Sequence, residues 1–383
     1  MNRDELAMSN MGRESTSVML REDRVLSVDL YRGVVMFLLI GTATGFYDLL
    51  AAPAYDGTIL HVLGLQFQHH PWHGLTMFDL GQPFFMFISG VAMVFSYEKR
   101  RERGERWVTA IGQALRRSFL LLVIGWALYR IGSEPGGFNG MFLLDILPQL
   151  AFAGLVAFFL IRRPAWLQAG AALGLLALTE LLYRFWSVAG FDQPFAPGHN
   201  FGSWLDTAVF GAASEENLVT FNIVPAAAFA ISGVLAAGLL RSGRPQKKML
   251  MSLIWTGLGG VALGLALDRL TPIIRRTCTS SFVILSIGLA FLSLALGYWL
   301  IDVMESRKRS VFFIAVGMNP LFIYLFALSG GAEWFTRIVA PFTMAFGGWV
   351  GQGPAEILTS LAAWGLMWGL CYWLYQRKIF IRI

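Results

Sequence analysis

The sequence predicts an all-α polytopic membrane protein with about ten transmembrane helices. Of its 383 residues, 56% are hydrophobic and only 14% are charged, and its mean hydropathy is +0.59. A soluble domain carries about 25% charged residues, so the composition excludes an ordinary soluble protein. The two cysteines, Cys278 and Cys371, lie in apolar segments and predict neither a disulfide framework nor a metal site.

Ten apolar segments are long enough to cross a bilayer, which takes roughly 20 residues. They cover about 30–50, 79–97, 110–131, 143–161, 165–187, 219–240, 250–268, 279–301, 310–330 and 356–375. A shorter apolar stretch, 334–350, is interpreted as interfacial or re-entrant, with an eleventh span as the alternative. Residues 1–27 are polar and lack the apolar core of a signal peptide. We expect them to form a cytoplasmic tail, followed by one membrane domain over 28–383.

The distribution of Lys and Arg predicts that both termini lie in the cytoplasm. With the N-terminus inside, most of the 30 Lys and Arg fall in the tail, the inner loops and the C-terminal segment. An eleventh span would move Arg377, Lys378 and Arg382 to the outside, which argues against it. The net charge of +6 is therefore explained by topology and requires no nucleic acid partner. We expect a multi-pass protein of a bacterial inner membrane.

The stretch 66–90 carries the most distinctive chemistry, because a histidine-rich loop runs directly into an apolar helix. His69, His70 and His73 lie in this loop, and Asp79 occupies the position expected for the N-cap of the helix. Three interpretations compete: histidines that stabilise the loop, a metal site built from His69, His73 and Asp79, and acid–base or acyl-transfer chemistry. The proline inside the loop and the lack of a second cluster argue against the metal.

Polar residues inside or beside the predicted spans mark further candidate sites, because an ionisable group in mid-membrane costs about 2.5–3.5 kcal/mol. Asp29 and Arg32 are three residues apart in the first span and can pair on one helix face. The alternative is that Arg32 binds a phosphate through its planar donor fork. Arg275 and Arg276, at the outer start of the eighth span, are either helix-end cations or contacts for an anionic ligand.

Two spans contain an Asn close to a Pro, Asn222 in the sixth and Asn319 in the ninth. A proline frees a backbone carbonyl, which the neighbouring amide can satisfy or which a ligand can use. The simpler interpretation is a kink with hydrogen bonds between helices. Trp72 stands apart from the other tryptophans because it shares the loop with the histidines.

Several motifs occur in an order that resembles bacterial membrane proteins related to heparan-alpha-glucosaminide N-acetyltransferase. The opening RVLSVDLYRGVVMFLL is similar to the start of that family, and QFQHHPWHGLTMFDLGQPFFMFISG is similar to its second signature. In the second segment the matching residues are His69, Trp72, Gly74, Asp79 and Leu80. Further matches follow in TFNIVPA, PIIRRTCTSSFVIL, FFIAVGMNPLFIY and the closing KIFIRI.

The resemblance implies an enzyme that transfers an acetyl group from cytoplasmic acetyl-CoA to an amino sugar across the membrane. It implies His69 as the base or acyl carrier, which Asp79 would orient, and no metal. Arg32 would then lie near the CoA phosphates, and Asn222 and Asn319 are candidates to hydrogen-bond the thioester or the sugar. Further candidates for binding substrate or cofactor are Asp29, Trp72 and Arg276. In place of an Asn that several relatives carry in the first span, this chain has Gly41-Thr42-Ala43-Thr44.

The expected partners are membrane lipid and a small sugar acceptor, with no nucleic acid, and a homodimer is compatible with the sequence. The main alternative is an inner-membrane transporter for amino sugars, because Asn and Pro inside spans suit broken helices along a substrate path. An inverted repeat is not visible in the sequence, which argues against a transporter. A membrane scaffold without activity is a third alternative. Uptake without acetyl-CoA would indicate the transporter, and acetyl transfer would indicate the enzyme.

Overall fold

The computed structural model describes residues 26–132, 141–304, 307–349 and 351–381. Within these ranges the chain is helical and contains no β-strand, as the sequence predicts. Eight helices are long and apolar enough to cross a membrane. They are α2 (Leu26–Ala43), α5 (Gly81–Glu102), α6 (Trp107–Gly132), α9 (Ala165–Phe185), α11 (Ile223–Leu240), α12 (Gln246–Leu267), α13 (Ser280–Tyr298) and α17 (Gln352–Gln376).

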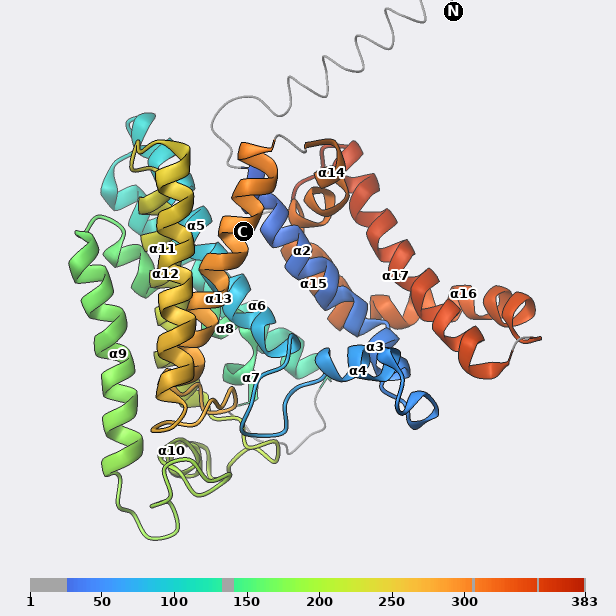
Figure 1. Cartoon of the computed structure of the whole chain (residues 1–383), viewed down its shortest axis with the longest axis horizontal. Helices are drawn as coiled ribbons and strands as arrows, with labels where there is room; N and C mark the ends of the chain where they lie inside the picture. Colours follow the sequence, from blue (N-terminus) through green and yellow to red (C-terminus); the bar gives the residue numbers. More distant parts are fainter. Residues whose placement is uncertain (1–25, 133–140, 305–306, 350, 382–383) are drawn as a thin grey trace, which may run out of the picture.

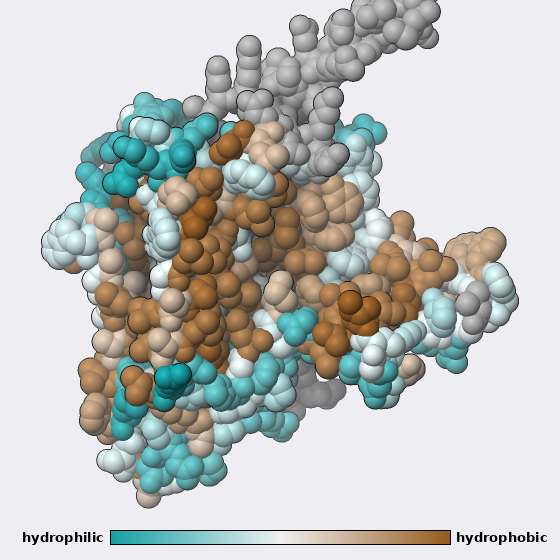
Figure 2. All heavy atoms as spheres, viewed as in Figure 1, coloured by the Kyte–Doolittle hydropathy of each residue, from teal (hydrophilic) through white to brown (hydrophobic). Residues whose placement is uncertain are grey.

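The surface has the layering of a membrane protein. Figure 2 shows a broad apolar band across the middle of the molecule, with polar residues gathered above and below it. In Figure 1, α2 runs from the upper to the lower part of the molecule, and the loop that follows α4 (Ile59–Gln66) lies low in the view. We call the lower side the histidine end, because it carries the loop 67–77. The opposite side, where α5 ends and α6 begins, is the basic end.

Two predicted spans are interrupted. The predicted span 30–50 is two helices, because α2 ends at Ala43 and a turn at Gly45, with φ 72°, precedes α3 (Phe46–Leu50). The predicted span 143–161 is divided into α7 (Met141–Leu144) and α8 (Ile146–Leu160). Asp145 causes this break, since its carboxylate accepts a hydrogen bond from the Leu147 amide at 2.9 Å and caps α8. The remaining helix is shorter than the other spans, so the number of crossings stays a prediction.

The predicted ninth span and the stretch 334–350 form one bent unit. It contains α14 (Arg307–Gly317), α15 (Pro320–Phe326) and α16 (Ala332–Gly347), and its two arms meet at 71°. The first break falls at Asn319, before a proline that cannot continue the helix. The second falls in a π-helical segment (Ala327–Gly331), where Gly330 has φ 91°. This geometry is that of a broken span or a re-entrant loop.

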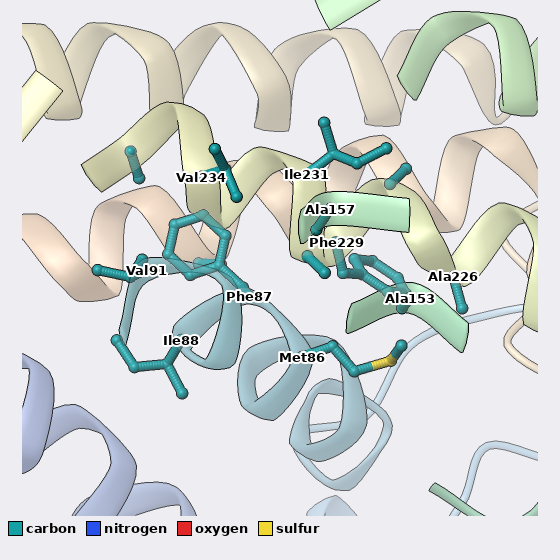
Figure 3. Packing of buried hydrophobic residues seen from close by; sticks show 14 of the residues in the cluster. Met86, Phe87, Ile88, Val91, Ala153, Ala157, Ala226, Phe229, Ile231 and Val234 are labelled. Carbon is teal, nitrogen blue, oxygen red and sulfur yellow. The ribbon is translucent and has the colours of Figure 1, made fainter. Parts of the chain in front are cut away.

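The core lies where α5 packs against α11, α8 and α13. Two glycines allow α5 and α11 to approach closely: a Cβ at Gly90 would lie 2.1 Å from the carbonyl oxygen of Ala230, and one at Gly233 would lie 2.0 Å from that of Phe87. Small residues at such a crossing bring helix backbones together in a membrane. Figure 3 shows the larger side chains, including Phe87 and Ile231, that fill the space around this contact. Helix α5 is thereby fixed along its length.

Short elements complete the histidine end. They are 3-10 turns at Pro53–Tyr55, Phe78–Leu80 and Thr220–Asn222, together with α10 (Phe201–Phe210). The connection between α9 and α11 therefore contains a helix, which Asn200 caps by accepting a hydrogen bond from the Ser203 amide. A π-helical turn at Trp299–Val303 extends α13 toward the basic end.

Candidate active site

Asp79 is the centre of the histidine end. The prediction that it is an N-cap is wrong, because it lies inside the turn Phe78–Leu80 and caps neither that turn nor α5. Its side chain is fully buried, and Oδ2 accepts hydrogen bonds from the Thr76 amide (3.1 Å), the Thr76 hydroxyl (2.9 Å) and the His70 amide (3.3 Å). The loop folds around this carboxylate because a buried charge needs such donors.

The other oxygen of Asp79 holds His69. Nδ1 of the imidazole lies 2.8 Å from Oδ1 of the carboxylate, as the sequence reasoning expects for a carboxylate that orients the ring. Because an ionised carboxylate can only accept, Nδ1 carries the hydrogen and Nε2 keeps its lone pair. The ring packs against Phe78 with 4.4 Å between centroids, and 38% of the His69 side chain is exposed. A base or nucleophile therefore reaches the surface of the loop.

The surroundings keep His69 neutral at physiological pH. Burial lowers its pKa from 6.5, the hydrogen bond with Asp79 opposes that change, and the positive charges of Arg275 and Arg276 lower the pKa further. The net effect is a pKa below the ordinary value. The ring can therefore take up a proton or attack an acyl carbon at neutral pH without first losing a proton.

Arg275, which the sequence marks only as a helix-end cation or an anion contact, is a member of the site and pairs with a carboxylate. Its Nε lies 3.1 Å from Oδ1 of Asp79, and its side chain is only 15% exposed. It comes from the loop 268–279 between α12 and α13. That loop is tied to the histidine loop, since the Gly74 amide donates to the Ile273 carbonyl at 2.9 Å and His73 Nε2 lies 2.8 Å from the Asp268 carboxylate.

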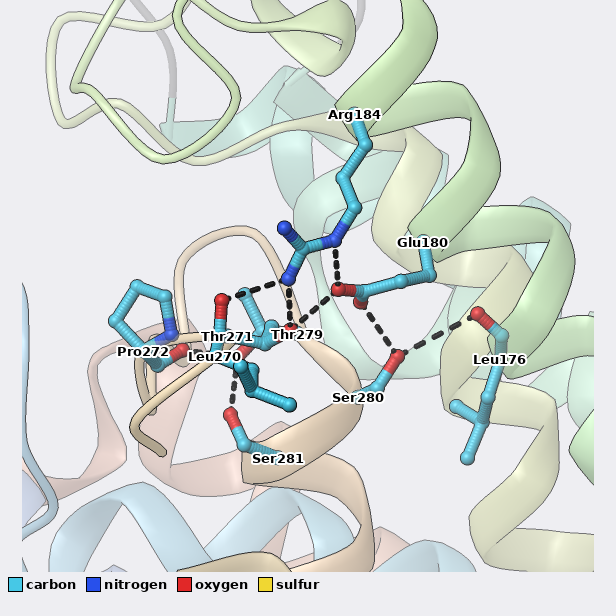
Figure 4. A network of polar contacts seen from close by, with 9 residues as sticks. All are labelled: Leu176, Glu180, Arg184, Leu270, Thr271, Pro272, Thr279, Ser280 and Ser281. Atoms are coloured by element: carbon cyan, nitrogen blue, oxygen red, sulfur yellow. Dashed lines mark hydrogen bonds and ion pairs between the residues drawn. The ribbon is translucent and has the colours of Figure 1, made fainter. Parts of the chain in front are cut away.

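A polar network fixes the same arginine-bearing loop to α9 (Figure 4). Glu180 accepts from Arg184 Nε at 2.7 Å and from the Ser280 hydroxyl at 3.0 Å. Arg184 also donates to the Thr271 hydroxyl at 2.8 Å, and that hydroxyl contacts Glu180. Each of these four side chains has a partner within the cluster, which ties the loop to α9. The position of Arg275 beside Asp79 is thus set by contacts on both sides of its loop.

The remaining candidates at the histidine end have structural contacts. Trp72 Nε1 donates to the Phe195 carbonyl at 2.8 Å and so anchors the histidine loop. Asn222 donates to the Arg276 carbonyl at 2.6 Å, while the Arg276 guanidinium donates to the Glu216 carbonyl. The Asn222 Oδ1 is buried and has no hydrogen-bond partner among the described residues. It lines a cavity of about 20 Å³ together with Arg275, which is room for one water.

Asn319 does not join this site. Its amide donates to the Ile379 carbonyl at 2.9 Å, and its carbonyl accepts from the Ile381 amide at 2.8 Å. Both halves of the side chain therefore hold the C-terminal segment at the basic end. The structure brings Asn319 near Asp29 and Arg32 instead, whose side chains pair at 3.6 Å, the contact that their spacing predicts.

A cavity of about 660 Å³ extends inward from the basic end. We call it the large cavity. Along α5 it is lined by residues from Phe85 to Arg103, a distance of ~27 Å at 1.5 Å per residue. Its inner limit, Phe85, follows Asp79 by six residues, or ~9 Å on the same scale. One carboxylate and five cations line it: Asp29 with Arg32, Lys99, Arg100, Arg103 and Arg117. Such a surplus of positive charge suits a ligand with several phosphates.

The histidines do not converge on a metal position. His69 pairs with Asp79, whereas His73 pairs with Asp268 on another loop. Within the described ranges, no group of three or more His, Cys, Asp or Glu side chains is placed to hold a metal ion. The arrangement at the histidine end is a carboxylate–imidazole pair with an arginine beside the carboxylate.

Comparison with known proteins gives a partial match. No family model matches the chain. A segment of 103 residues is 31% identical to the heparan-alpha-glucosaminide N-acetyltransferase of Mus musculus, and a segment of 102 residues is 32% identical to that of Homo sapiens. Each match covers 27% of this chain but only 13% of the relative's length. The chain is thus a multi-pass helical membrane protein that resembles these acetyltransferases over about a quarter of its length.

Proposed function

We propose that the protein is a transmembrane acyltransferase that moves an acetyl group from acetyl-CoA to the amine of a small amino sugar. The observation that carries this proposal is the His69–Asp79 pair, which leaves a neutral imidazole with a free Nε2 at the histidine end. The partial similarity to N-acetyltransferases supports the same class of reaction. The acceptor named for those relatives suggests an amino sugar here.

The large cavity is the proposed site for the donor. Its cations would bind the phosphates of CoA, with Arg32 from α2, Arg103 from the end of α5 and Arg117 from α6. The fit rests on the surplus of positive charge: apart from Asp29, no carboxylate among the described residues lines this cavity. The acyl end of the donor would point along α5 toward the histidine end. With the N-terminus in the cytoplasm, as the Lys and Arg distribution predicts, the donor enters from the cytoplasm and the acceptor binds on the periplasmic side of an inner membrane.

His69 has two routes to the product, and both use the same lone pair. As a base, Nε2 takes a proton from the acceptor amine while that amine attacks the thioester carbonyl, and the C–S bond breaks with CoA leaving as thiolate. As a nucleophile, Nε2 attacks the thioester first and carries the acetyl group to the amine. In both routes Asp79 fixes the ring through Nδ1 and stabilises the positive charge that develops on it.

The test uses purified protein, radiolabelled acetyl-CoA and a panel of amino sugars. We expect label on a sugar with the wild type and a loss of at least a thousandfold with His69→Ala. His73→Ala is the matched control, because His73 lies in the same loop but pairs with Asp268, and it should retain most of the activity. Equal activity in the wild type and His69→Ala would refute the proposed role of His69.

A wild-type protein that neither transfers acetyl groups nor hydrolyses acetyl-CoA would refute the enzyme itself. Sugar uptake into sealed vesicles, measured without acetyl-CoA, would then test the transporter. Transport predicts accumulation of unmodified sugar, whereas the proposed enzyme predicts acetylated sugar with no net movement.

A further inference from the structure

A second cavity, which we call the side cavity, lies between α5, α6 and α8 at the basic end. Its volume is about 390 Å³. It shares the wall formed by Arg100 and Arg117 with the large cavity, whereas Gln113, Arg116 and Gly154 line the side cavity alone. The proposed reaction does not require this second space.

The side cavity is polar and cationic at one part of its lining and apolar at another. Arg100, Arg116 and Arg117 line it, and none of the described residues in its lining is Asp or Glu. Within the described part of the chain, no ion pair joins Arg116 or Arg117 to a carboxylate. The apolar part of the lining consists of Met93, Ala114, Leu120, Leu121, Leu150 and Phe158. A ligand that matches both parts carries a phosphate and a hydrocarbon chain.

The side cavity also reaches the outer surface of α6. Arg116 lines it and is exposed, and the exposed neighbours Leu115 and Phe119 are apolar, as on a lipid-facing helix. Arg116 follows the first residue of α6, Trp107, by nine residues, or ~14 Å. Because the 26 residues of α6 span ~39 Å and a hydrocarbon core is about 30 Å thick, Arg116 falls within ~9 Å of the boundary. Its long side chain can reach a lipid phosphate there.

We propose that the side cavity binds a phospholipid from the leaflet at the basic end, with the phosphate between Arg116 and Arg117 and one acyl chain against Phe158. Because Arg117 also lines the large cavity, the lipid would share a cation with the donor. Lipid binding would then alter donor binding. This consequence rests on the proposed function, whereas the lipid site itself does not.

Two variants change residues that line the side cavity and do not line the large one. Arg116→Gln removes a charge that only the side cavity uses. Gly154→Leu fills its apolar part, and the backbone tolerates the change, because a Cβ at Gly154 has only the Met93 Cε within 4 Å, at 3.8 Å. Arg103→Gln is the matched control, since Arg103 lines the large cavity alone.

The experiment titrates the purified full-length protein with phosphatidylglycerol and, separately, with CoA, and follows each complex by native mass spectrometry. We expect Arg116→Gln and Gly154→Leu to weaken binding of the first lipid at least tenfold, with unchanged CoA binding. Arg103→Gln should show the reverse pattern. Intact melting transitions, followed by tryptophan fluorescence, identify variants that are folded.

Three results separate the alternatives. Equal lipid binding by the wild type and both side-cavity variants would overturn the lipid site. Loss of CoA binding in Arg116→Gln and Gly154→Leu, with lipid binding unchanged, would overturn it too and make the side cavity an extension of the donor site. A wild type that binds phosphatidylglycerol in the side cavity but no CoA would support the lipid site and refute the proposed donor site.

Discussion

Replacing Asp79 by Asn is expected to exchange the protonation of the two His69 nitrogens. In the wild type, Oδ2 of Asp79 faces three donors: the Thr76 amide, the Thr76 hydroxyl and the His70 amide. An asparagine can place only its carbonyl oxygen there, because its NH2 group would meet donors. The NH2 group must then face His69 Nδ1, which has to accept, and it displaces Arg275 Nε, which lies 3.1 Å from Oδ1 in the wild type. The hydrogen moves to Nε2, and the lone pair that the reaction needs is lost.

The size of the effect follows from this tautomer. An Asp-to-Asn change that inverts the histidine in a serine protease triad lowers kcat by about 10⁴, which corresponds to about 5 kcal/mol of barrier. We expect a loss of about 10³–10⁴ here, with acetyl-CoA binding unchanged because the large cavity is untouched. Single-turnover transfer of labelled acetyl groups measures the rate. Nitrogen NMR of protein labelled at its five histidines reports which nitrogen of His69 is protonated.

Thr76→Val is the control for loss of packing around the carboxylate. It removes one donor to Oδ2 but leaves the two backbone amides, so the orientation of His69 should persist and the rate should fall less than tenfold. Asp79→Asn that keeps more than a tenth of the wild-type rate, with Nε2 protonated, would refute the assigned role of the lone pair. An Asp79→Asn variant that keeps more than a tenth of the wild-type rate while His69 Nδ1 remains protonated would refute the prediction that the substitution moves the hydrogen to Nε2.

Four further outcomes are expected. Because the pKa of His69 is lowered from 6.5 and the neutral ring is active, the rate should be constant near neutral pH. As the pH is lowered the ring gains a proton, and the rate should fall with a midpoint below pH 6.5; a midpoint above pH 7 would contradict this. Arg117→Gln should raise the KM for acetyl-CoA about tenfold or more, since a hydrogen bond to a charged group contributes about 1.5–3 kcal/mol, and should leave the KM for the sugar unchanged. Gly90→Val should abolish the folded monomer in size-exclusion chromatography, because its Cβ would lie 2.1 Å from the Ala230 carbonyl oxygen. Burial raises the pKa of Cys278 to about 12, so maleimide at pH 8 should label it only after denaturation, as mass spectrometry of native and unfolded samples would show.

Hydropathy located the helices of this protein but not their interruptions. An apolar run has the same appearance whether or not one residue inside it stops the helix. The break at Asp145 depends on a side chain that caps the following turn. The break before Pro320 is expected from the sequence, but the contacts of Asn319 with the distant Ile379 and Ile381 are not. Contacts between residues that lie far apart in the chain leave no local pattern in the sequence.

The sequence could predict only the part of the candidate site whose residues lie close together in the chain. His69 and Asp79 are ten residues apart in one loop, so the sequence could place them together. Arg275 reaches Asp79 from a loop nearly 200 residues away, and only the folded bundle brings the two side chains to 3.1 Å. From the sequence, Arg117 is only one of the cations on the predicted cytoplasmic side. Nothing in its local sequence distinguishes a residue that lines a cavity from one at a solvated helix end.

Helix α5 connects the two ends of the proposed reaction as one rigid rod. Asp79 directly precedes it, and the cations Lys99, Arg100 and Arg103 line the large cavity at its far end. The close contact at Gly90 resists a shift of the helix against α11. In the proposed reaction, the spacing between bound phosphates and His69 would therefore be set by the fold and would select donors by their length. A thioester on a carrier shorter by one helical turn, ~5.4 Å, would reach either the cations or the histidine, but not both.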